Sequence, residues 1–454
     1  MTYTPHTEAD IRRMLDVIGV ASIDDLFADV PAHLRVGPLD LPPALCEFEA
    51  TRAMETLAGR NRTVRQWASY LGGGAYEHFI PATVPALALR GEFATAYTPY
   101  QAEASQGTLQ AVYEFQSMLC ALTELEVANA SMYDGASALA EAALMAMRGA
   151  GRSTFLVPQS LNPRYRDTLI TYTHSVGARF IEVPLATEGG VTDVELWSSH
   201  AAEHSNDLAG VIIPVTNTLG ACEPWEALAE VGRCHGALVI AVANPMAFSV
   251  LRGPGAWGAD VCVGEAQPLG LPLSWGGPYC GFMTAKAEHV RRMPGRIVGC
   301  SVDSRGQRAF TLTLQTREQH IRREKATSNI CTNQGLMALQ VCIYLAMVGR
   351  EGFRRIGLAN LERAALLRQM LLEVDGVEPV TGDDFFNEFT VKLPMPAKAA
   401  LEHLRHGGIL GGISFLQPNW LTICVTETKA ETHLLAYVQQ VRAAIMGSRP
   451  VLVR

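Results

Sequence analysis

The chain has 454 residues, of which 48% are hydrophobic and 18% are charged, a composition typical of a globular protein large enough for two domains. Its net charge of −8 argues against a nucleic-acid partner, and no apolar run approaches the roughly 20 residues that span a bilayer. Residues 1–15 are polar and of mixed charge, unlike a secretory signal or a transit peptide, so we expect a cytoplasmic protein with no membrane partner.

A glycine break separates an N-terminal helical arm from the rest of the chain. Residues 1–70 read as helical, and the run YLGGGAYEHFIP at 70–81 ends that pattern. Beyond it, strands rich in Val, Ile and Leu alternate with helices: strands at 153–158, 179–185, 208–217, 237–243 and 259–265, and helices at 163–177, 193–204 and 224–236. This alternation predicts a mostly parallel sheet covered on both faces, which binds ligands beyond the carboxyl ends of its strands.

The C-terminal part is expected to be helical from 331 to about 374 and then to form a smaller α/β unit. A large parallel-sheet domain followed by a small α/β domain is the layout of the aspartate-aminotransferase-like (fold type I) fold of enzymes that use pyridoxal phosphate (PLP). We therefore predict an α/β protein in three parts: a helical arm at 1–70, a large α/β domain at 71–330, and interdomain helices with a small C-terminal domain at 331–454.

The segment ADVCVGEAQPLGLPLSWGGPYCGF at 259–282 has the strand, polar turn and Gly-rich reversal of a PLP active site, but no lysine. In PLP enzymes such a turn carries the lysine that forms a Schiff base with the cofactor. The strand at 237–243 should likewise end near an Asp that pairs with the pyridine nitrogen. It reads AVAN at 241–244, and the neutral Asn244 cannot hold that proton as an Asp does.

The absence of lysine is not limited to this turn but extends over the whole predicted sheet. The five lysines of the chain are Lys286, Lys325, Lys392, Lys398 and Lys429, so none precedes residue 286. Lys286 reads as a solvated helix start. Lys325 lies in a polar segment that could reach a site, which keeps a stand-alone PLP enzyme as an alternative.

A turn at 131–147, SMYDGASALAEAALMAM, contains a glycine and opens a helix. Free N–H groups at a helix N-terminus suit a phosphate, so Asp134, Gly135 and Ala136 could line a vestigial cofactor pocket with Asn244 and Gln267. Asp134 could equally be a helix cap, and its charge would repel a phosphate placed beside it.

Two polar segments are candidates for contact with a second chain. The first carries Tyr97, Tyr100, Gln101, Glu103, Ser105 and Gln106, and suits a binding channel or a subunit contact. The second, at 314–335, carries Arg317, His320, Arg322, Arg323 and Lys325, followed by Thr327, Ser328 and Asn329. It reads either as a charged surface turn or as an interface element that offers cations and hydroxyls to a phosphate or carboxylate in the neighbouring subunit.

Neither the cysteines nor the histidines suggest a metal site. The ten cysteines occur singly, mostly in apolar runs, which indicates small buried side chains in a reducing compartment. His200 and His204 have i,i+4 spacing, but their setting, SSHAAEHSND, offers no third ligand, so we expect a solvated helix end instead of a metal site.

Several long motifs resemble the P-protein of the glycine cleavage system. They are YLGGGAYEHFIP, YTPYQAEASQGTLQAVYEFQ, YDGASALAEA, PLGLPLSWGGPYCGF, the run from Met293 to Thr332 and the C-terminal GGI, and they cover nearly the full length. In that family the protein is one chain of two homologous halves or two separate subunits, and this chain is similar to the N-terminal half. Alignment backward from Gly276 places Gln267 at the lysine position, whereas alignment forward from Asp260 gives Pro268. The resemblance also puts Ala241 near the position of the pyridine-pairing acid.

The resemblance implies a chain without catalytic residues of its own. PLP would be covalently bound to the partner subunit in an α2β2 complex, where glycine loses its carboxylate as CO2 and the aminomethyl group passes to the lipoyl disulfide of H-protein. This chain would complete the pocket through Thr327–Asn329 and the Tyr97–Gln106 segment. The alternatives are a stand-alone PLP enzyme and a regulatory protein that reuses the fold.

Overall fold

The computed structural model describes residues 5–330 and 333–447 of the chain. It separates into two compact units, one ending at Arg62 and the other beginning at Thr63. The first unit holds the helices α1 (Glu8–Ile18) and α2 (Glu47–Ala58), neither of which buries a residue. Helix α1 begins with a capping box between Thr7 and Asp10 and ends at Gly19, whose φ of 86° suits a glycine.

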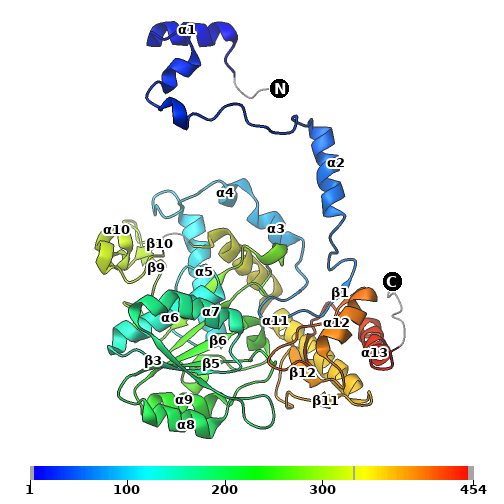
Figure 1. Ribbon diagram of the computed structural model, residues 1–454. Coiled ribbons are helices and arrows are strands. Elements are labelled where there is room, and N and C mark those ends of the chain that lie inside the picture. Colours follow the sequence, from blue (N-terminus) through cyan, green and yellow to red (C-terminus); the bar gives the residue numbers. More distant parts are fainter. Residues whose placement is uncertain (1–4, 331–332, 448–454) are drawn as a thin grey trace. The chain divides into compact units, whose positions relative to one another are not determined.

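A seven-stranded sheet organises the second unit (Figure 1). Its strand order is β2-β8-β7-β6-β5-β3-β4, in which β3 to β7 run parallel and β8 pairs antiparallel with β7 and β2. The strands are β2 (Val127–Ala128), β3 (Thr154–Pro158), β4 (Arg179–Val183), β5 (Leu208–Pro214), β6 (Leu238–Ala243), β7 (Val261–Glu265) and β8 (Gly281–Ala285). The predicted α/β architecture with a mostly parallel sheet is confirmed.

Helices cover both faces of this sheet. Helices α6 (Gly135–Ala150) and α7 (Pro163–Thr173) lie over one face, and α8 (Val194–Glu203) and α9 (Trp225–Cys234) lie over the other (Figure 1). Helix α5 (Gln106–Thr123) also packs on the second face. Neighbouring residues of β5 show the alternation, because Val211 and Ile213 belong to one core and Ile212 to the other.

The long helix α11 (Gly335–Leu372) connects the sheet to the C-terminal part and is interrupted at Gly349, whose φ is 60°. Among the described residues it alone is long and apolar enough to cross a membrane. Its first turns are nevertheless part of the sheet core, where Ala338, Val341 and Tyr344 are buried. This is the burial expected of a core helix.

A small antiparallel sheet, β11 (Glu378–Pro379), β12 (Glu388–Lys392) and β14 (Trp420–Cys424), forms the C-terminal part with helices α12 (Ala397–His406) and α13 (Glu431–Ile445). Strand β1 (Ala68–Ser69) pairs in parallel with β13 (Ile409–Leu410), and Tyr70 is buried in the same core. Residues just after the N-terminal unit are therefore integral to the C-terminal core. The predicted boundary near residue 330 stays a prediction.

Shorter elements complete the second unit. They are the helices α3 (Thr83–Ala88), α4 (Gly91–Ala94) and α10 (Gln319–Arg322) and the antiparallel hairpin β9 (Ile297–Val302) with β10 (Arg308–Thr313). The hairpin was not predicted, since its strands lack a sustained apolar face and bury only Ile297, Val298 and Phe310. It carries the chain into the cationic segment that follows Leu314.

Candidate functional site

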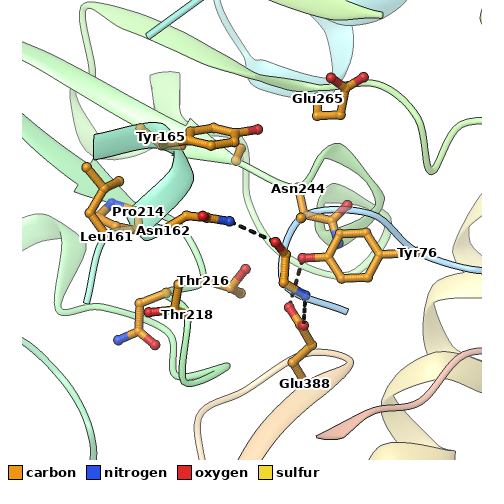
Figure 2. Close-up of a pocket in the computed structure, with 15 residues that line it drawn as sticks. Tyr76, Leu161, Asn162, Tyr165, Pro214, Thr216, Thr218, Asn244, Glu265 and Glu388 are labelled. Atoms are coloured by element: carbon orange, nitrogen blue, oxygen red, sulfur yellow. Dashed lines mark hydrogen bonds between the residues drawn. The ribbon is translucent and has the colours of Figure 1, made fainter. Parts of the chain in front are cut away.

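The carboxyl ends of β5, β6 and β7 face the N-terminus of α6, where a fold of this kind binds its ligand. The cavity at this place has a volume of only about 60 Å³. Ordinary small-molecule sites have roughly 300–1,000 Å³. Figure 2 shows Asn244, Glu265 and Tyr165 around it, with Tyr76 and Glu388 entering from other parts of the chain. Protein groups therefore fill most of the space in which a ligand would lie.

Glu265, the last residue of β7, occupies the anion position at the N-terminus of α6. Its Oε2 accepts a hydrogen bond of 3.1 Å from the Gly135 N–H, and its Oε1 accepts bonds from the N–H groups of Cys280 (2.8 Å) and Gln267 (3.1 Å). The carboxyl group thus satisfies N–H donors that could otherwise bind a phosphate. This role was not predicted from the sequence, although a carboxylate at the end of a buried strand is a signal for it.

Close packing explains why a glycine stands at position 135. A Cβ there would lie 2.8 Å from the carbonyl carbon of Gly264 and would overlap the hydroxyl of Tyr165. Only a residue without a side chain lets the helix approach β7 closely enough for the bond to Glu265. Asp134 caps the same helix, since its Oδ1 accepts from the Ser137 N–H at 2.7 Å.

Burial controls the ionisation of Glu265. It is 5% exposed, and burial raises its pKa to about 7. The N–H donors of Cys280 and Gly135 oppose this rise, and the charge of Asp134 adds to it. The carboxyl group therefore titrates near neutral pH.

Gln267, at one of the two candidate lysine positions, connects the turn after β7 to the run YLGGGAYEHFIP at 70–81, called the glycine-rich segment below. Its Nε2 donates to the carbonyl oxygens of Tyr76 (2.9 Å) and Leu271 (2.8 Å), and its Oε1 accepts from the Tyr76 N–H at 2.8 Å. It is 1% exposed. An amide can donate and accept at once, whereas a lysine ammonium has no acceptor for the Tyr76 N–H.

The glycine-rich segment is held from the C-terminal part by Glu388 of β12. The Tyr76 hydroxyl donates to Glu388 Oε2 at 2.8 Å, and the Gly73 N–H donates to Oε1 at 2.7 Å (Figure 2). On the other side, Asn162 Nδ2 donates to the Gly73 carbonyl at 2.8 Å. Burial raises the pKa of Glu388 above its usual value, against the bonds from Gly73 and Tyr76. Hydrogen bonds on both sides therefore hold the segment in place along one side of the site.

The remaining members of the predicted vestigial pocket lie at the same end of the sheet. Asn244 lines the cavity and is 8% exposed. Its Oδ1 accepts from the Met246 N–H at 3.1 Å, and its Nδ2 is buried without a hydrogen-bond partner among the described residues. Ala136 follows Gly135 in the first turn of α6. The structure thus brings the five predicted pocket residues to one end of the sheet.

The predicted tyrosines line a second, larger cavity. Tyr97 and Tyr100 border a space of about 500 Å³, together with Arg296 and the apolar side chains of Leu336 and Leu339. The Arg296 guanidinium lies 4.1 Å from the centroid of the Tyr100 ring, a cation–π contact that was not predicted from the sequence. Tyr97 is 89% exposed and is therefore free for contact with another molecule.

The other residues of this predicted segment have different surroundings. Gln106 has a structural role, because its Nε2 donates to the Phe310 carbonyl (2.8 Å) and its Oε1 accepts from the Phe310 N–H (2.9 Å). Gln101 and Glu103 are exposed, and Ser105 is half-buried at the start of α5. Only part of this segment thus faces the cavity.

The cationic segment forms a third cavity of about 400 Å³. Its lining includes Arg291, Arg322, Lys325 and Thr327. Lys325 is exposed, and no hydrogen bond or ion pair within 5–330 or 333–447 involves its ammonium. Arg317 also lines the cavity, but its guanidinium is turned to the carbonyl oxygens of Met293, Gly295 and Leu314.

The hydroxyl turn beside this cavity is connected to the sheet domain. Ser328 Oγ donates to Glu141 Oε1 of α6 at 2.8 Å, which fixes the turn. Thr327 is half-buried and lines the cavity, whereas Asn329 and Arg323 are exposed. Arg296, which lines the second cavity, lies 3.4 Å from Glu318, the residue that follows Arg317 of the third cavity.

Comparisons with known proteins agree with this geometry. A family model described as glycine cleavage system P-protein matches residues 1–441. A probable glycine dehydrogenase (decarboxylating) subunit 1 from Thioalkalivibrio sulfidiphilus is 46% identical over 457 residues, covering 98% of this chain and 100% of that protein. A crystal structure of inhibitor-bound glycine decarboxylase (P-protein) of the glycine cleavage system is 45% identical, with a TM-score of 0.90 over 98% of this chain and 100% of that one.

More distant structures share the fold alone. A sphingosine-1-phosphate lyase from Burkholderia pseudomallei is 15% identical, with a TM-score of 0.67 over 92% of this chain and 95% of that one. The predicted fold type I class and the family resemblance are both confirmed.

Replacing Gln267 by leucine should destabilise the chain. The change leaves the Tyr76 N–H, the Tyr76 carbonyl and the Leu271 carbonyl without the partner that Gln267 provides, at about 1–3 kcal/mol for each buried group left unpaired. Thermal denaturation should show a clear fall in Tm. Gln439→Leu is the matched control, because Gln439 is exposed on α13 and should change stability by less than about 0.5 kcal/mol. Equal Tm values for the two variants would contradict the assigned role.

The raised pKa of Glu265 predicts a pH-dependent stability difference from Glu265→Gln. Between an unfolded value near 4.5 and a folded value of about 7, the folded chain retains a proton that the unfolded chain releases. Stability contributed by this group therefore falls as pH rises through that window. The Tm of the wild type minus that of the variant should decrease from pH 4.5 to pH 7. A difference that grows with pH would show that the N–H donors keep the carboxylate ionised.

Proposed function

This chain belongs to the glycine cleavage system P-protein family, and from that membership we propose that it is the lysine-lacking, non-catalytic subunit of a heteromeric glycine decarboxylase. The partner is proposed to be glycine dehydrogenase subunit 2 (beta), which carries PLP on its own lysine in an α2β2 assembly. The reaction releases CO2 from glycine and passes the aminomethyl group to the lipoyl group of H-protein. When bound, PLP supplies the electron sink for the loss of carboxylate.

The observation that carries this proposal is that side chains of this chain occupy the space in which a cofactor would bind. Glu265 satisfies the N–H donor of α6, and Gln267 is committed to Tyr76 and Leu271. The family resemblance places Ala241 near the position of the pyridine-pairing acid, and no lysine precedes residue 286. These residues do not fit PLP, because they offer neither an amine, nor a pyridine-pairing acid, nor a free phosphate site.

The cationic cavity supports a contribution to a site in the partner. Lys325 and Arg322 are exposed cations beside the Thr327 hydroxyl, and the bond from Ser328 to Glu141 orders the turn that presents them. Such a group suits a phosphate or carboxylate. We propose that Thr327, Ser328 and Asn329, with Arg323 and Lys325, complete the anion-binding part of the partner's pocket.

The apolar cavity beside Tyr97 and Tyr100 supports a second contribution. Its side chains give an aromatic and aliphatic wall, and its volume of about 500 Å³ is in the range of ordinary ligand sites. The dithiolane and alkyl chain of a lipoyl arm are apolar. We propose that this cavity borders the channel that admits the arm, together with the residues that follow Tyr100 in the sequence, Gln101, Glu103, Ser105 and Gln106.

The N-terminal unit is consistent with assembly into a complex. Within this unit the helices bury no residue, although they carry apolar side chains such as Phe48, Met54 and Leu57. A segment of this kind gains stability from burial against another surface. We propose that part of residues 5–62 contacts the partner subunit.

Reconstitution from separate chains tests the proposal that this chain is non-catalytic and that its partner carries PLP. The chain alone, incubated with PLP and reduced with borohydride, should give no PLP-labelled lysine peptide, and it should not decarboxylate glycine. Addition of a subunit 2 that carries a lysine in the equivalent turn should restore glycine-dependent CO2 release with lipoylated H-protein as acceptor. A labelled Lys325 peptide would support a stand-alone enzyme instead, and a failure of the two chains to co-purify would support a regulatory protein.

Lys325→Ala tests the contribution of the cationic cavity. Loss of a charge-assisted hydrogen bond of about 1.4 kcal/mol should raise the PLP concentration required for half-maximal activity of the complex about tenfold. Lys398→Ala is the control, because Lys398 is exposed on α12 away from this cavity. Activity should be measured against PLP concentration for both variants. Identical curves for the two variants would remove Lys325 from the proposed pocket.

A further inference from the structure

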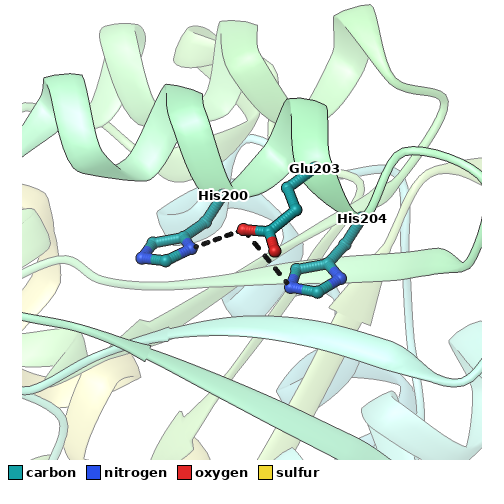
Figure 3. Close-up of side chains that lie close together, drawn as sticks. All are labelled: His200, Glu203 and His204. Carbon is teal, nitrogen blue, oxygen red and sulfur yellow. Dashed lines mark ion pairs between the residues drawn. The ribbon is translucent and has the colours of Figure 1, made fainter.

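Two imidazoles and a carboxylate meet at the C-terminal turn of α8. His200 and Glu203 belong to its last turn, and His204 is its C-cap. The Glu203 carboxylate lies between the two rings (Figure 3), with Oε2 at 3.5 Å from His200 Nδ1 and 4.0 Å from His204 Nε2. The spacing of the histidines suggested no third ligand, but the structure supplies one, because the i+3 carboxylate folds back between the i and i+4 rings.

The spacing of these donor atoms is close to that of a tetrahedral metal site. One donor atom from each of the three residues lies within 4.8 Å of the others. Bonds of about 2.0–2.2 Å from zinc to nitrogen and oxygen place tetrahedral donors roughly 3.4 Å apart, so small side-chain rotations close the observed distances. His200 Nδ1 is buried and makes no hydrogen bond among the described residues, which leaves its lone pair available in the neutral ring.

Two other clusters in the chain show what distinguishes this one. Asp260, Glu288 and His289 also lie close together, but the Lys286 ammonium is 2.5 Å from Asp260 Oδ1 and supplies the positive charge there. Glu402 on α12 contacts His406 at 3.1 Å, but Arg405 lies 2.5 Å from the same carboxylate. Among the described residues, Glu203 in contrast forms ion pairs only with the imidazoles of His200 and His204. An imidazole can bind a metal when it is neutral.

We propose that His200, Glu203 and His204 bind a divalent transition cation, with Zn²⁺ as the best match. Two imidazoles and a carboxylate suit zinc, cobalt or nickel and disfavour calcium and magnesium, which prefer oxygen ligands. Three ligands from the protein leave a fourth position for water. The exposed fractions of His200 and His204, 33% and 20%, allow an ion to enter from solvent.

The location gives the bound ion a structural effect. Helix α8 packs on the sheet through Trp197 and Ala201, and the chain leaves its end for β5 through Asp207. Asp207 in turn accepts hydrogen bonds from Ser153 (2.9 Å) and Thr154 (2.6 Å) at the start of β3. An ion that holds His200 to His204 therefore fixes the short connection between a packed helix and the central sheet.

A zinc titration of the full chain tests the site. Among the described residues, Cys46, Cys234 and Cys300 are exposed thiols that would also bind zinc, and Cys331 lies outside the described residues. The titration is therefore made in a C46S/C234S/C300S/C331S background. Calorimetry should show binding of one Zn²⁺ per chain, and a thermal scan should show a higher Tm with Zn²⁺. His200→Gln, His204→Gln and Glu203→Gln should each weaken affinity at least tenfold, since even the loss of a partner outside the ligand shell costs about 10–100-fold.

His406→Gln provides the matched control. It removes an exposed helical histidine that contacts a glutamate, as His200 does, but it leaves the proposed ligands intact. Affinity and the zinc-dependent rise in Tm should be unchanged in this variant. Absence of zinc binding in the background protein, or equal loss of affinity in His406→Gln and His204→Gln, would overturn the proposal. Circular dichroism of each variant confirms that any loss does not come from unfolding.

Discussion

The hydrogen bond from the Gly135 N–H to Glu265 is the contact on which the rest of the site depends. A helix N-terminus that faces the carboxyl ends of parallel strands attracts anions, because its N–H groups are unpaired and its dipole is positive there. Here the carboxyl group of the last residue of β7 takes that position from within the chain. Glu265 accepts the hydrogen bond of the Gly135 N–H, and Gln267 in the turn that follows holds the glycine-rich segment at Tyr76. Together these contacts close the space for a cofactor.

Much of the architecture could be predicted from the sequence, because apolar periodicity follows burial directly. The continuous Val and Ile run of β5 indicates a strand buried on both faces, and Val211 to Ile213 contact the two cores in alternation. The absence of a Schiff-base lysine could also be predicted from the sequence, because it depends only on which residue types occur in the turn after a given strand. The motifs then indicated the family, which the comparisons confirm.

The contacts that close the site could not be predicted, because they join residues far apart in the sequence. Nothing local indicates that Glu388 accepts from Tyr76, 312 positions earlier, or that Gln267 bonds to the backbone of Tyr76. The orientation of Glu203 between His200 and His204 depends on side-chain rotamers, which spacing alone does not give. The Tyr100–Arg296 stacking likewise requires the three-dimensional arrangement.

The glycine-rich segment has a mechanical consequence for the second unit. It is attached at one side to the turn after β7 through Gln267 and at the other to β12 through Glu388, while Lys429 contacts Glu77 at 2.7 Å nearby. Hinge motion between two lobes requires the segments that connect them to change conformation. Here buried hydrogen bonds hold the glycine-rich segment to both the sheet and the C-terminal part. We therefore expect the sheet and the C-terminal part to move as one body. Relative motion of these two parts would then require the buried bonds to Gln267 and Glu388 to break.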